Sequence, residues 1–361
     1  MRYLSLLLGI TILLLNGCNG DIQYDRWNVS APFFSARHDH SLDNVAVKDP
    51  SIVYYQGKYH LFYTAKSKTN SGNKTSFRTG CAYASAETLD KLNDAKRFNI
   101  DSIAEMPVIA PQIFYFEPHN LWYLIAHTPE VKGNLSALIP VYLTNANIEN
   151  VYGWSEAKEI KTGKSDDGFW IDFWVICNEH QAYLFYSGQN GSLFRLDCPL
   201  NTFPEGFSKS QPKIALSQQD ADNSGSWKMF EAAHIYHVKK ENRYLALLEG
   251  AYHHPVRTGN VDSRNRFIFG MTADSLNGKW ERIEFEKDEF LAEAKNLFSE
   301  DGSRSHYTQV SHPELIRSGF NQKLEIEDFH LTMVFQSFDG SEIPDSYHYN
   351  ELPWELALMK N

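Results

Sequence analysis

Short stretches of β-branched and aromatic residues recur in pairs along most of the chain, and each pair is joined by a few turn residues. The second member of each pair is easy to recognise: KYHLFYTA (58–65), LWYLIAHT (121–128), AYLFYSG (182–188), RYLALLEG (243–250) and FHLTMVFQ (329–336). Turns such as Tyr55-Gln56-Gly57 precede these runs. Short strands joined by turn residues are typical of β-hairpins, so the pattern predicts an all-β fold.

The pairs are also evenly spaced. The first four second strands begin at residues 58, 121, 182 and 243, and the fifth follows a longer insertion between 279 and 309. Repeats of this length built from short strands are typical of propellers with four strands per blade. We therefore predict a single five-bladed β-propeller over residues 41–361, preceded at 18–40 by a tether and a first strand. A β-sandwich is the alternative fold, but it would not require such a repeat.

The N-terminus has the features of an export signal. Leu6–Leu15 is apolar apart from Thr11, and it ends in Leu15-Asn16-Gly17-Cys18. Small residues before a cysteine resemble a bacterial lipoprotein processing site, although Asn16 is not the favoured residue there. We predict a signal peptide at 1–17 and acylation of Cys18, which would anchor an exported lipoprotein in the outer membrane. An ordinary secretory signal is the other interpretation.

Charge and cysteine content narrow the function classes. The net charge is −11 and no basic run is present, which excludes a nucleic-acid partner. Aromatic residues make up 14%, which suits both β-strands and sugar-binding surfaces. The remaining cysteines are three in number and have no metal-type spacing, so we predict that Cys81, Cys177 and Cys198 are buried free thiols. We also expect the protein to be a monomer.

One polar residue interrupts the first strand of each pair: Asp49, Gln112, Asp172, Glu231 and His312. If these strands line the propeller axis, the five side chains converge. Each carboxylate alone could be a strand-end cap, but three together would raise one another's pKa and mark a functional site. Two carboxyl groups are what glycoside hydrolysis needs, and a third can tune the acid.

At these same residues the chain resembles glycoside hydrolase family 62, the α-L-arabinofuranosidases, which share a five-bladed propeller clan with family 43. The resemblance covers roughly residues 45 to 358. Its landmarks, in order, are Lys48-Asp49-Pro50, Ala110-Pro111-Gln112, Ile171-Asp172, Gly188-Gln189-Asn190-Gly191, Phe230-Glu231-Ala232, Ser311-His312 and Tyr349-Asn350 before Leu352-Pro353-Trp354.

The resemblance implies roles for the matching residues. Asp49 would be the general base, Glu231 the general acid, and Asp172 the residue that tunes the acid, in an inverting reaction without a cofactor. The residues expected to frame the bound arabinose are Lys48, Arg266, Tyr349 and Asn350. His312 matches a position near the axis where family members often hold a calcium ion; a buried, hydrogen-bonded histidine is the alternative.

The chain also departs from the family pattern. Residues 125–130 replace an aromatic-rich segment, Phe269 replaces an expected arginine, and the segment Asp301–His306 differs. These positions lie where a polymer backbone would rest. The leading hypothesis is an exo-acting α-L-arabinofuranosidase on arabinoxylan or a related polysaccharide. The alternatives are a family 43-type β-xylosidase or arabinanase, and a non-catalytic glycan-binding lipoprotein that would have lost its acid or base.

Overall fold

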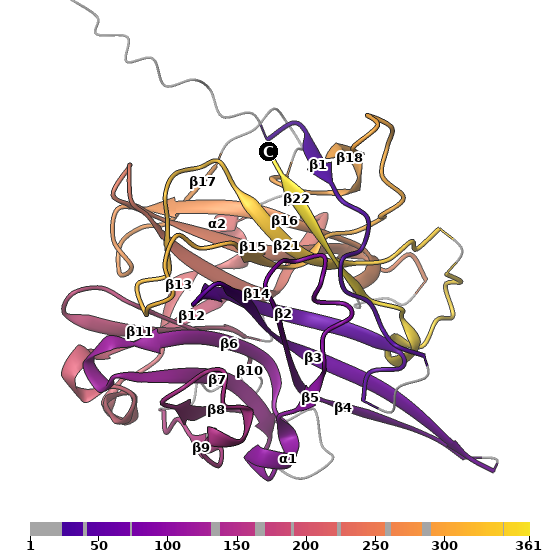
Figure 1. Ribbon diagram of the computed structural model, residues 1–361. Helices are drawn as coiled ribbons and strands as arrows, with labels where there is room; N and C mark the ends of the chain where they lie inside the picture. Colours follow the sequence, from indigo (N-terminus) through magenta and orange to yellow (C-terminus); the bar gives the residue numbers. More distant parts are fainter. Residues whose placement is uncertain are drawn as a thin grey trace, which may run out of the picture.

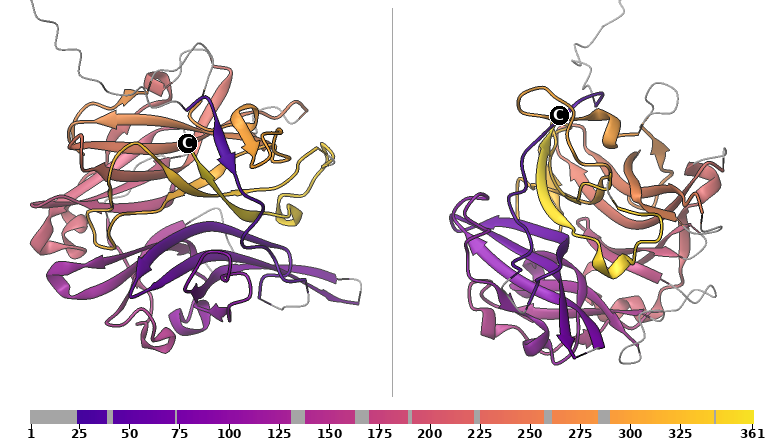
Figure 2. Two further views of the ribbon diagram at one scale, coloured as in Figure 1. Left: turned by 45° about the horizontal axis from the view of Figure 1, so that its top comes forward. Right: turned by 90° about the vertical axis from the view of Figure 1, so that its right-hand side faces the viewer.

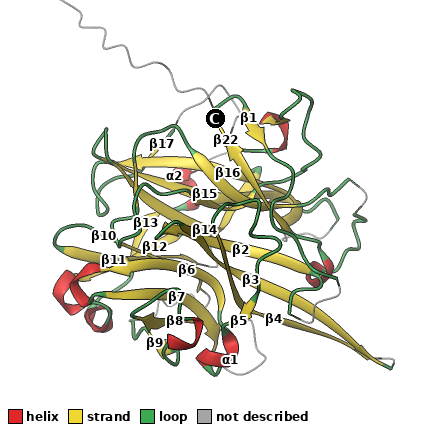
Figure 3. Cartoon of the chain, viewed as in Figure 1, coloured by secondary structure: helices red, strands yellow, loops and turns green. Residues whose placement is uncertain are grey.

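The computed structural model describes residues 24–38, 42–72, 74–130, 138–162, 170–188, 191–221, 225–256, 261–283, 290–341 and 343–361. The predicted signal peptide at 1–17 and Cys18 lie outside these residues. Within them, five β-sheets form the body of the molecule (Figure 1; Figure 3), and no helix is long and apolar enough to cross a membrane.

The first three sheets have the same simple order, in which each strand pairs with the next along the chain. The first blade is β2 (Ala46–Tyr55), β3 (Lys58–Ser71), β4 (Lys74–Ala86) and β5 (Phe98–Asn99). The second is β6 (Ile109–Phe116), β7 (Leu121–Pro129), β8 (Leu138–Asn145) and β9 (Lys158–Glu159). The third is β10 (Trp170–Cys177), β11 (Gln181–Gly188), β12 (Leu193–Pro199) and β13 (Lys213–Leu216).

The last two sheets each have a fifth strand. The fourth blade is β14 (Trp227–Val238), β15 (Arg243–His253), β16 (Val261–Ala273) and β17 (Glu281–Arg282), with β20 (Glu325–Ile326) parallel to β14. The fifth blade is β19 (Ser311–Leu315), β21 (Thr332–Ser337), β22 (Glu355–Lys360), β1 (Trp27–Val29) and β18 (Leu297–Ser299). Because β1 pairs with β22, the first and last described strands complete the same blade, and Figure 2 shows the indigo strand β1 beside the yellow C-terminal strand.

Short helices lie in the connections. The described residues contain α1 (Asp101–Ala104) and α2 (Gln218–Ala221). They also contain 3-10 helices η1 (Glu117–His119), η2 (Val151–Gly153), η3 (Leu200–Thr202), η4 (Glu205–Lys209), η5 (Ala294–Asn296) and η6 (Tyr349–Glu351). The predicted five-bladed propeller is confirmed.

The predicted second strands lie within β3, β7, β11, β15 and β21, although β21 begins three residues later than predicted, at Thr332. The insertion after residue 279 contributes β18, which pairs with β1 in the fifth blade.

The core fills the space between blades with aromatic side chains. Trp27, Trp122 and Trp354 are fully buried, and the Trp27 indole N–H donates to the Leu291 carbonyl at 2.6 Å. The faces of neighbouring blades pack against one another, and a large aromatic ring at an inward-facing strand position buries more apolar surface there than a smaller side chain would. Cys81, Cys177 and Cys198 are buried free thiols, as predicted.

Candidate active site

The innermost strand of every blade has an irregularity at an equivalent place. Pairing shifts near the start of β2, β6, β10, β14 and β19, which is the signature of a β-bulge. One residue in each bulge has a positive φ: Asp49 (48°), Ala110 (49°), Asp172 (55°), Ala232 (51°) and His312 (47°). Non-glycine residues in this conformation carry backbone strain, which clusters at functional sites. Recurrence in all five blades therefore marks a built-in feature of the propeller axis.

This register corrects the sequence-based alignment of the five polar residues. Asp49, Asp172 and His312 are equivalent, but Ala110 and Ala232 occupy the matching positions in the second and fourth blades. Glu231 precedes its positive-φ residue by one position. Gln112 lies two positions after Ala110, the positive-φ residue of its strand. Its side-chain oxygen accepts a hydrogen bond from the Val175 N–H at 2.7 Å, and its side-chain nitrogen donates one to the Val175 carbonyl at 2.8 Å, in the next blade. Gln112 therefore joins two blades.

A pocket opens above these bulges. It has a volume of about 170 Å³ and is lined by Lys48, Asp49, Thr64, Lys66, Thr79, Ile109, His127, Leu138, Ile171, Asp172, Glu231, His312, Tyr349 and Asn350. Drug-sized ligands occupy roughly 300–1,000 Å³, so this pocket suits one small sugar unit. The structure thus brings the three predicted carboxyl groups together with Lys48, Tyr349, Asn350 and His312.

Glu231 lies between a cation and two further acids. Arg266, a predicted site residue that does not line the pocket, contacts Glu231 and also binds Glu249 Oε1 at 2.6 Å. Burial raises the pKa of Glu231 to about 7, and the nearby Glu249 and Asp172 act in the same direction, against the effect of Arg266. Glu231 can therefore hold a proton near neutral pH.

Asp49 has the opposite environment. Its carboxylate lies 3.3 Å from the Lys48 ammonium and 3.4 Å from the His312 ring. Burial alone would favour the neutral acid, but Lys48 and His312 outweigh it and lower the pKa of Asp49 far below its usual range. For Lys48, burial opposes the charge and the Asp49 carboxylate outweighs it, so its pKa is raised. Asp49 is therefore an ionised carboxylate that can accept a proton.

Asp172 links the other two acids. Its Oδ2 accepts a hydrogen bond from the Ala232 N–H at 3.0 Å, directly beside Glu231, and lies 3.7 Å from the His312 ring. Burial raises the pKa of Asp172, but His312 outweighs this effect and the net shift is downward. An ionised Asp172 near Glu231 makes ionisation of Glu231 harder.

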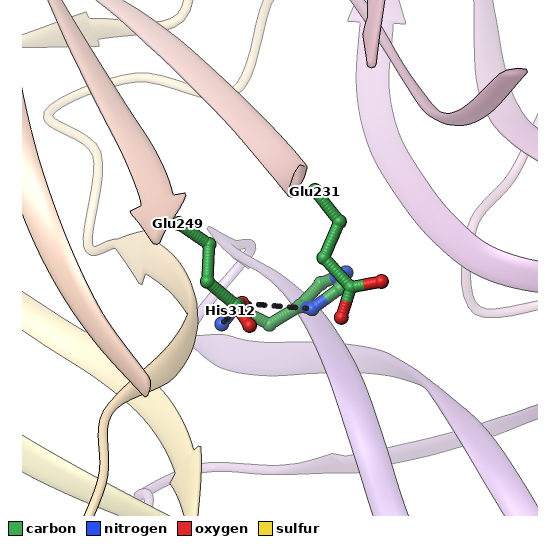
Figure 4. Close-up of side chains that lie close together, drawn as sticks. All are labelled: Glu231, Glu249 and His312. Carbon is green, nitrogen blue, oxygen red and sulfur yellow. Dashed lines mark hydrogen bonds and ion pairs between the residues drawn. The ribbon is translucent and has the colours of Figure 1, made fainter. Parts of the chain in front are cut away.

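His312 lies among carboxylates, and Figure 4 shows Glu231 and Glu249 reaching toward it from two strands. Ligand atoms of these three residues lie within 4.8 Å of one another, as in a metal site. Arg266 already contacts both glutamates, so a metal ion between them would be repelled by the guanidinium.

Nδ1 of the His312 ring lies 3.7 Å from Glu249 Oε2 and 3.4 Å from Asp49 Oδ1, and Asp49 Oδ1 in turn lies 3.3 Å from the Lys48 ammonium. His312 Nδ1 and Asp49 Oδ1 are both buried and have no hydrogen-bond partner in the described part of the chain. Burial lowers the pKa of His312, but Asp49 and Asp172 outweigh it and raise it to about 9. The pocket floor thus favours a positive charge at His312, which either a proton on the ring or a bound cation in place of that proton could supply.

The sequence prediction missed several residues of this site. Glu249 accepts hydrogen bonds from the Ser311 hydroxyl at 2.8 Å and the His312 N–H at 3.0 Å, and it is fully buried. A lone carboxylate in the apolar run LALLEG (245–250), opposite Glu231, is the signal that could have revealed it. Lys66 and His127 also line the pocket. Lys66 follows the apolar run at 58–65, and His127 lies in the segment 125–130 that departs from the family pattern.

A five-bladed propeller with carboxyl groups of opposed pKa at its axis is an arrangement suited to a glycoside hydrolase. A sequence profile described as glycosyl hydrolase family 62 matches residues 36–360, and the chain therefore belongs to this family. This match confirms the resemblance seen in the sequence and favours family 62 over family 43.

Individual relatives agree. Alpha-L-arabinofuranosidase C of Cellvibrio japonicus (strain Ueda107) is 29% identical over 337 residues, which are 93% of this chain and 47% of the relative. The chain thus spans about half the length of this curated relative. The catalytic domain of a Coprinopsis cinerea family 62 α-L-arabinofuranosidase matches with a TM-score of 0.74 and 29% identity, over 93% of this chain and 96% of that one. A family 62 hydrolase in complex with xylotriose matches with a TM-score of 0.72 and 25% identity, over 93% and 97%.

Proposed function

We propose that this glycoside hydrolase removes single α-L-arabinofuranosyl groups from the side chains of a plant polysaccharide, with inversion of configuration. One observation carries the proposal. Asp49 and Glu231 line the same small pocket, and their surroundings lower the pKa of one carboxyl group while raising that of the other to about 7. Two neighbouring carboxyl groups whose pKa values are shifted in opposite directions are suited to act as a base and an acid.

In the proposed reaction Glu231 is protonated and donates its proton to the glycosidic oxygen as the bond to the anomeric carbon breaks. Asp49 accepts a proton from a water molecule, whose oxygen bonds to the anomeric carbon on the opposite face. The products are free arabinose of inverted configuration and the shortened polymer. Asp172 keeps Glu231 protonated through its own negative charge.

Lys48, Tyr349 and Asn350 position the sugar in the pocket, and Arg266 supports Tyr349 from outside the pocket lining. Lys48 and Arg266 lie 5.3 and 5.8 Å from the centre of the Tyr349 ring, which is 36% exposed and lies at the pocket mouth. Tyr349 and Asn350 offer one aromatic face and one amide to sugar hydroxyl groups. The pocket volume supports an exo-acting enzyme, because a single pentose fits and a chain of sugars does not.

We also propose a calcium ion held by His312 and by oxygen atoms around it, since calcium prefers oxygen ligands. When bound, it would supply a fixed positive charge at the pocket floor. Asp49, Lys48 and Glu231 carry out the positioning and proton transfer described above, and none of these steps passes through the ion.

Arabinoxylan is the proposed polymer, because a family 62 relative binds xylotriose. The alternative of a non-catalytic glycan-binding protein is disfavoured, since the acid, the base and the tuning carboxylate are all present. The proposed location is the outer membrane, through an acylated Cys18.

Release of arabinose from p-nitrophenyl α-L-arabinofuranoside and from arabinoxylan tests the activity, and NMR of the first-formed anomer tests the stereochemistry. Inversion is expected to give the β-anomer first. Exclusive release of xylose would support a β-xylosidase, and an initial α-anomer would contradict the assignment of Asp49 as a base acting through water.

A further inference from the structure

The second blade contributes three of the side chains that line the pocket, namely Ile109, His127 and Leu138. Ile109 in β6 and His127 in β7 lie directly opposite each other, and opposite residues of an antiparallel pair share a face. Leu138 lies opposite Pro129, two residues after His127, so it is on this face as well. Ile109 and Leu138 are aliphatic. Among the lining residues, His127 is therefore the only one from this blade that can form a side-chain hydrogen bond.

The His127 side chain is buried, with 3% exposure, and it packs edge-on against the Phe173 ring at 6.4 Å between ring centres. Its Nδ1 has no hydrogen-bond partner in the described part of the chain. A buried polar group without a partner is costly, and most buried polar side chains in proteins are paired for this reason. Because His127 lines the pocket, a bound ligand can supply the missing partner.

The state of the ring suits a sugar hydroxyl group. Burial lowers the pKa of His127, although Asp172 and Asp49 act in the opposite direction, so the ring is neutral near neutral pH. A neutral imidazole has one nitrogen that donates and one that accepts, and a half-turn of the ring about the Cβ–Cγ bond moves each nitrogen to the other side. A hydroxyl group both donates and accepts, so it can pair with either nitrogen.

The order of the blades indicates which end of the sugar His127 faces. The innermost strands contact one another in chain order: β2 with β6, β6 with β10, β10 with β14, β14 with β19 and β19 with β2. The second blade therefore lies between the first and the third, and the fourth blade, which carries Glu231, is not its neighbour. Asp172 and Asp49, in the two neighbouring blades, are the carboxylates that act most strongly on His127. Since Glu231 is assigned to the glycosidic oxygen, His127 faces the other end of the sugar.

We propose that His127 forms a hydrogen bond with the arabinofuranosyl hydroxyl group at C3 or C5, at the end of the sugar opposite the anomeric carbon. This inference rests on the proposed removal of arabinofuranosyl groups. It makes His127 a specificity-determining residue, because an arabinofuranosyl group that is esterified or glycosylated at that hydroxyl cannot form the bond. His127 lies in the segment 125–130, where the chain departs from the family pattern, so the contact belongs to this chain's own sequence.

Four aryl glycosides test the proposal: p-nitrophenyl α-L-arabinofuranoside and its 2-deoxy, 3-deoxy and 5-deoxy analogues. The measured quantity is kcat/KM of the parent divided by kcat/KM of each analogue, in the wild type and in His127→Phe. This substitution keeps an aromatic ring against Phe173 but removes the hydrogen bond. Dividing the wild-type ratio by the variant ratio gives a quotient that isolates the coupling of His127 to one hydroxyl group, since the analogue's own reactivity cancels.

We expect a quotient of about 5 or more for the 3-deoxy or the 5-deoxy analogue, because a net hydrogen bond of ordinary strength corresponds to about that factor. For the 2-deoxy analogue the quotient should be about 1. His127→Asn and His127→Gln carry an amide near the positions of Nδ1 and Nε2, so at least one of them should keep part of the wild-type preference. His330→Phe is the matched control, because His330 is 75% exposed and does not line the pocket, and its quotients should all be about 1.

Quotients near 1 for all three analogues would overturn the inference, since a ring that only fills space slows all four substrates by the same factor when it is replaced. A large quotient for the 2-deoxy analogue alone would contradict the end of the sugar assigned to His127. Thermal unfolding checks that His127→Phe is folded, and His127→Leu, which also removes the hydrogen bond, replaces it if it is not. A wild-type enzyme that cleaves the parent glycoside keeps its proposed function whatever the quotients are, whereas an enzyme that cleaves none of the four loses both.

Discussion

Replacing Glu249 by Gln should shift the pH profile of the enzyme although Glu231, the proposed acid, is left unchanged. Glu249 is fully buried behind the pocket, and its charge raises the pKa of Glu231. In the proposed reaction, Glu231 can act as the acid only while it holds its proton. If its pKa falls, the proton is lost at a lower pH, and the basic limb of the activity profile must shift toward acid.

The size of the shift follows from the geometry. Ligand atoms of Glu231 and Glu249 lie within 4.8 Å, and two like charges at that distance repel by about 3.5 kcal/mol at an effective dielectric constant of about 20. That energy corresponds to a shift of about 2.5 units in the pKa of Glu231, and stronger screening by solvent would reduce the shift to about 1 unit. Wild-type enzyme should lose activity above a pH of about 7. In Glu249→Gln the limb should move down by between about 1 and 2.5 units.

The assay is kcat/KM for release of arabinose from an arabinosylated oligosaccharide, which reports the pKa values of the free enzyme. A natural leaving group is needed, because an aryl leaving group departs with little protonation. Loss of Glu249 also leaves Arg266 without one partner, so thermal unfolding must show that the variant is folded at the assay temperature.

Glu117→Gln is the matched control, because it removes one exposed carboxylate far from the pocket and should leave the basic limb unchanged. The reasoning is refuted if Glu249→Gln leaves the limb in place or moves it toward alkaline pH. Either result would mean that another group sets the limb or that Arg266 controls Glu231 alone.

Three further predictions concern single residues. Glu231→Gln should lower turnover of arabinoxylan by about 10²–10⁴-fold and that of aryl arabinofuranosides less, whereas Asp49→Asn should lower both alike; near-normal turnover in either variant removes its assigned role. About one calcium ion per chain should remain after dialysis, and a chelator should lower the Tm of wild type but not of His312→Ala; a chain without calcium would leave the protonated ring as the cation. Cys18→Ser should release the protein from membranes, and a variant that stays bound contradicts the lipid anchor.

The repeat of strands could be predicted because it depends on local pattern. Each blade repeats the same alternation of apolar runs and turns, so the period from 58 to 243 identifies the propeller without any knowledge of contacts. The boundaries were less predictable. β1 joins the last blade only because β22 offers it an open edge, and that edge exists only in the assembled ring.

The site could be predicted only in part, because the bulges depend on blades packing around an axis. Sequence pattern placed Glu231 level with Asp49 and Asp172, but the positive φ lies at Ala232. Neither Ala110 nor Ala232 shows any polar signal in the sequence. Glu249 was missed for a related reason: it lies on a second strand, and it reaches the axis because β15 pairs with β14 directly opposite Glu231.

The protonation of Glu231 depends on the balance of charges around it. The buried cluster contains the carboxylates of Asp49, Asp172 and Glu249, and the cations Lys48, Arg266 and the charged His312 site. Three negative charges meet these three positive ones, and burial disfavours the charge on Lys66, the other lysine of the pocket, so a fourth carboxylate would remain largely uncompensated in a buried site, which is costly. Removing an anion such as Glu249 removes a repulsion and lowers the pKa of Glu231. Removing a cation such as Lys48 should have the opposite effect and move the basic limb toward alkaline pH, so the two variants together test whether the charge balance, and not burial alone, sets the acid.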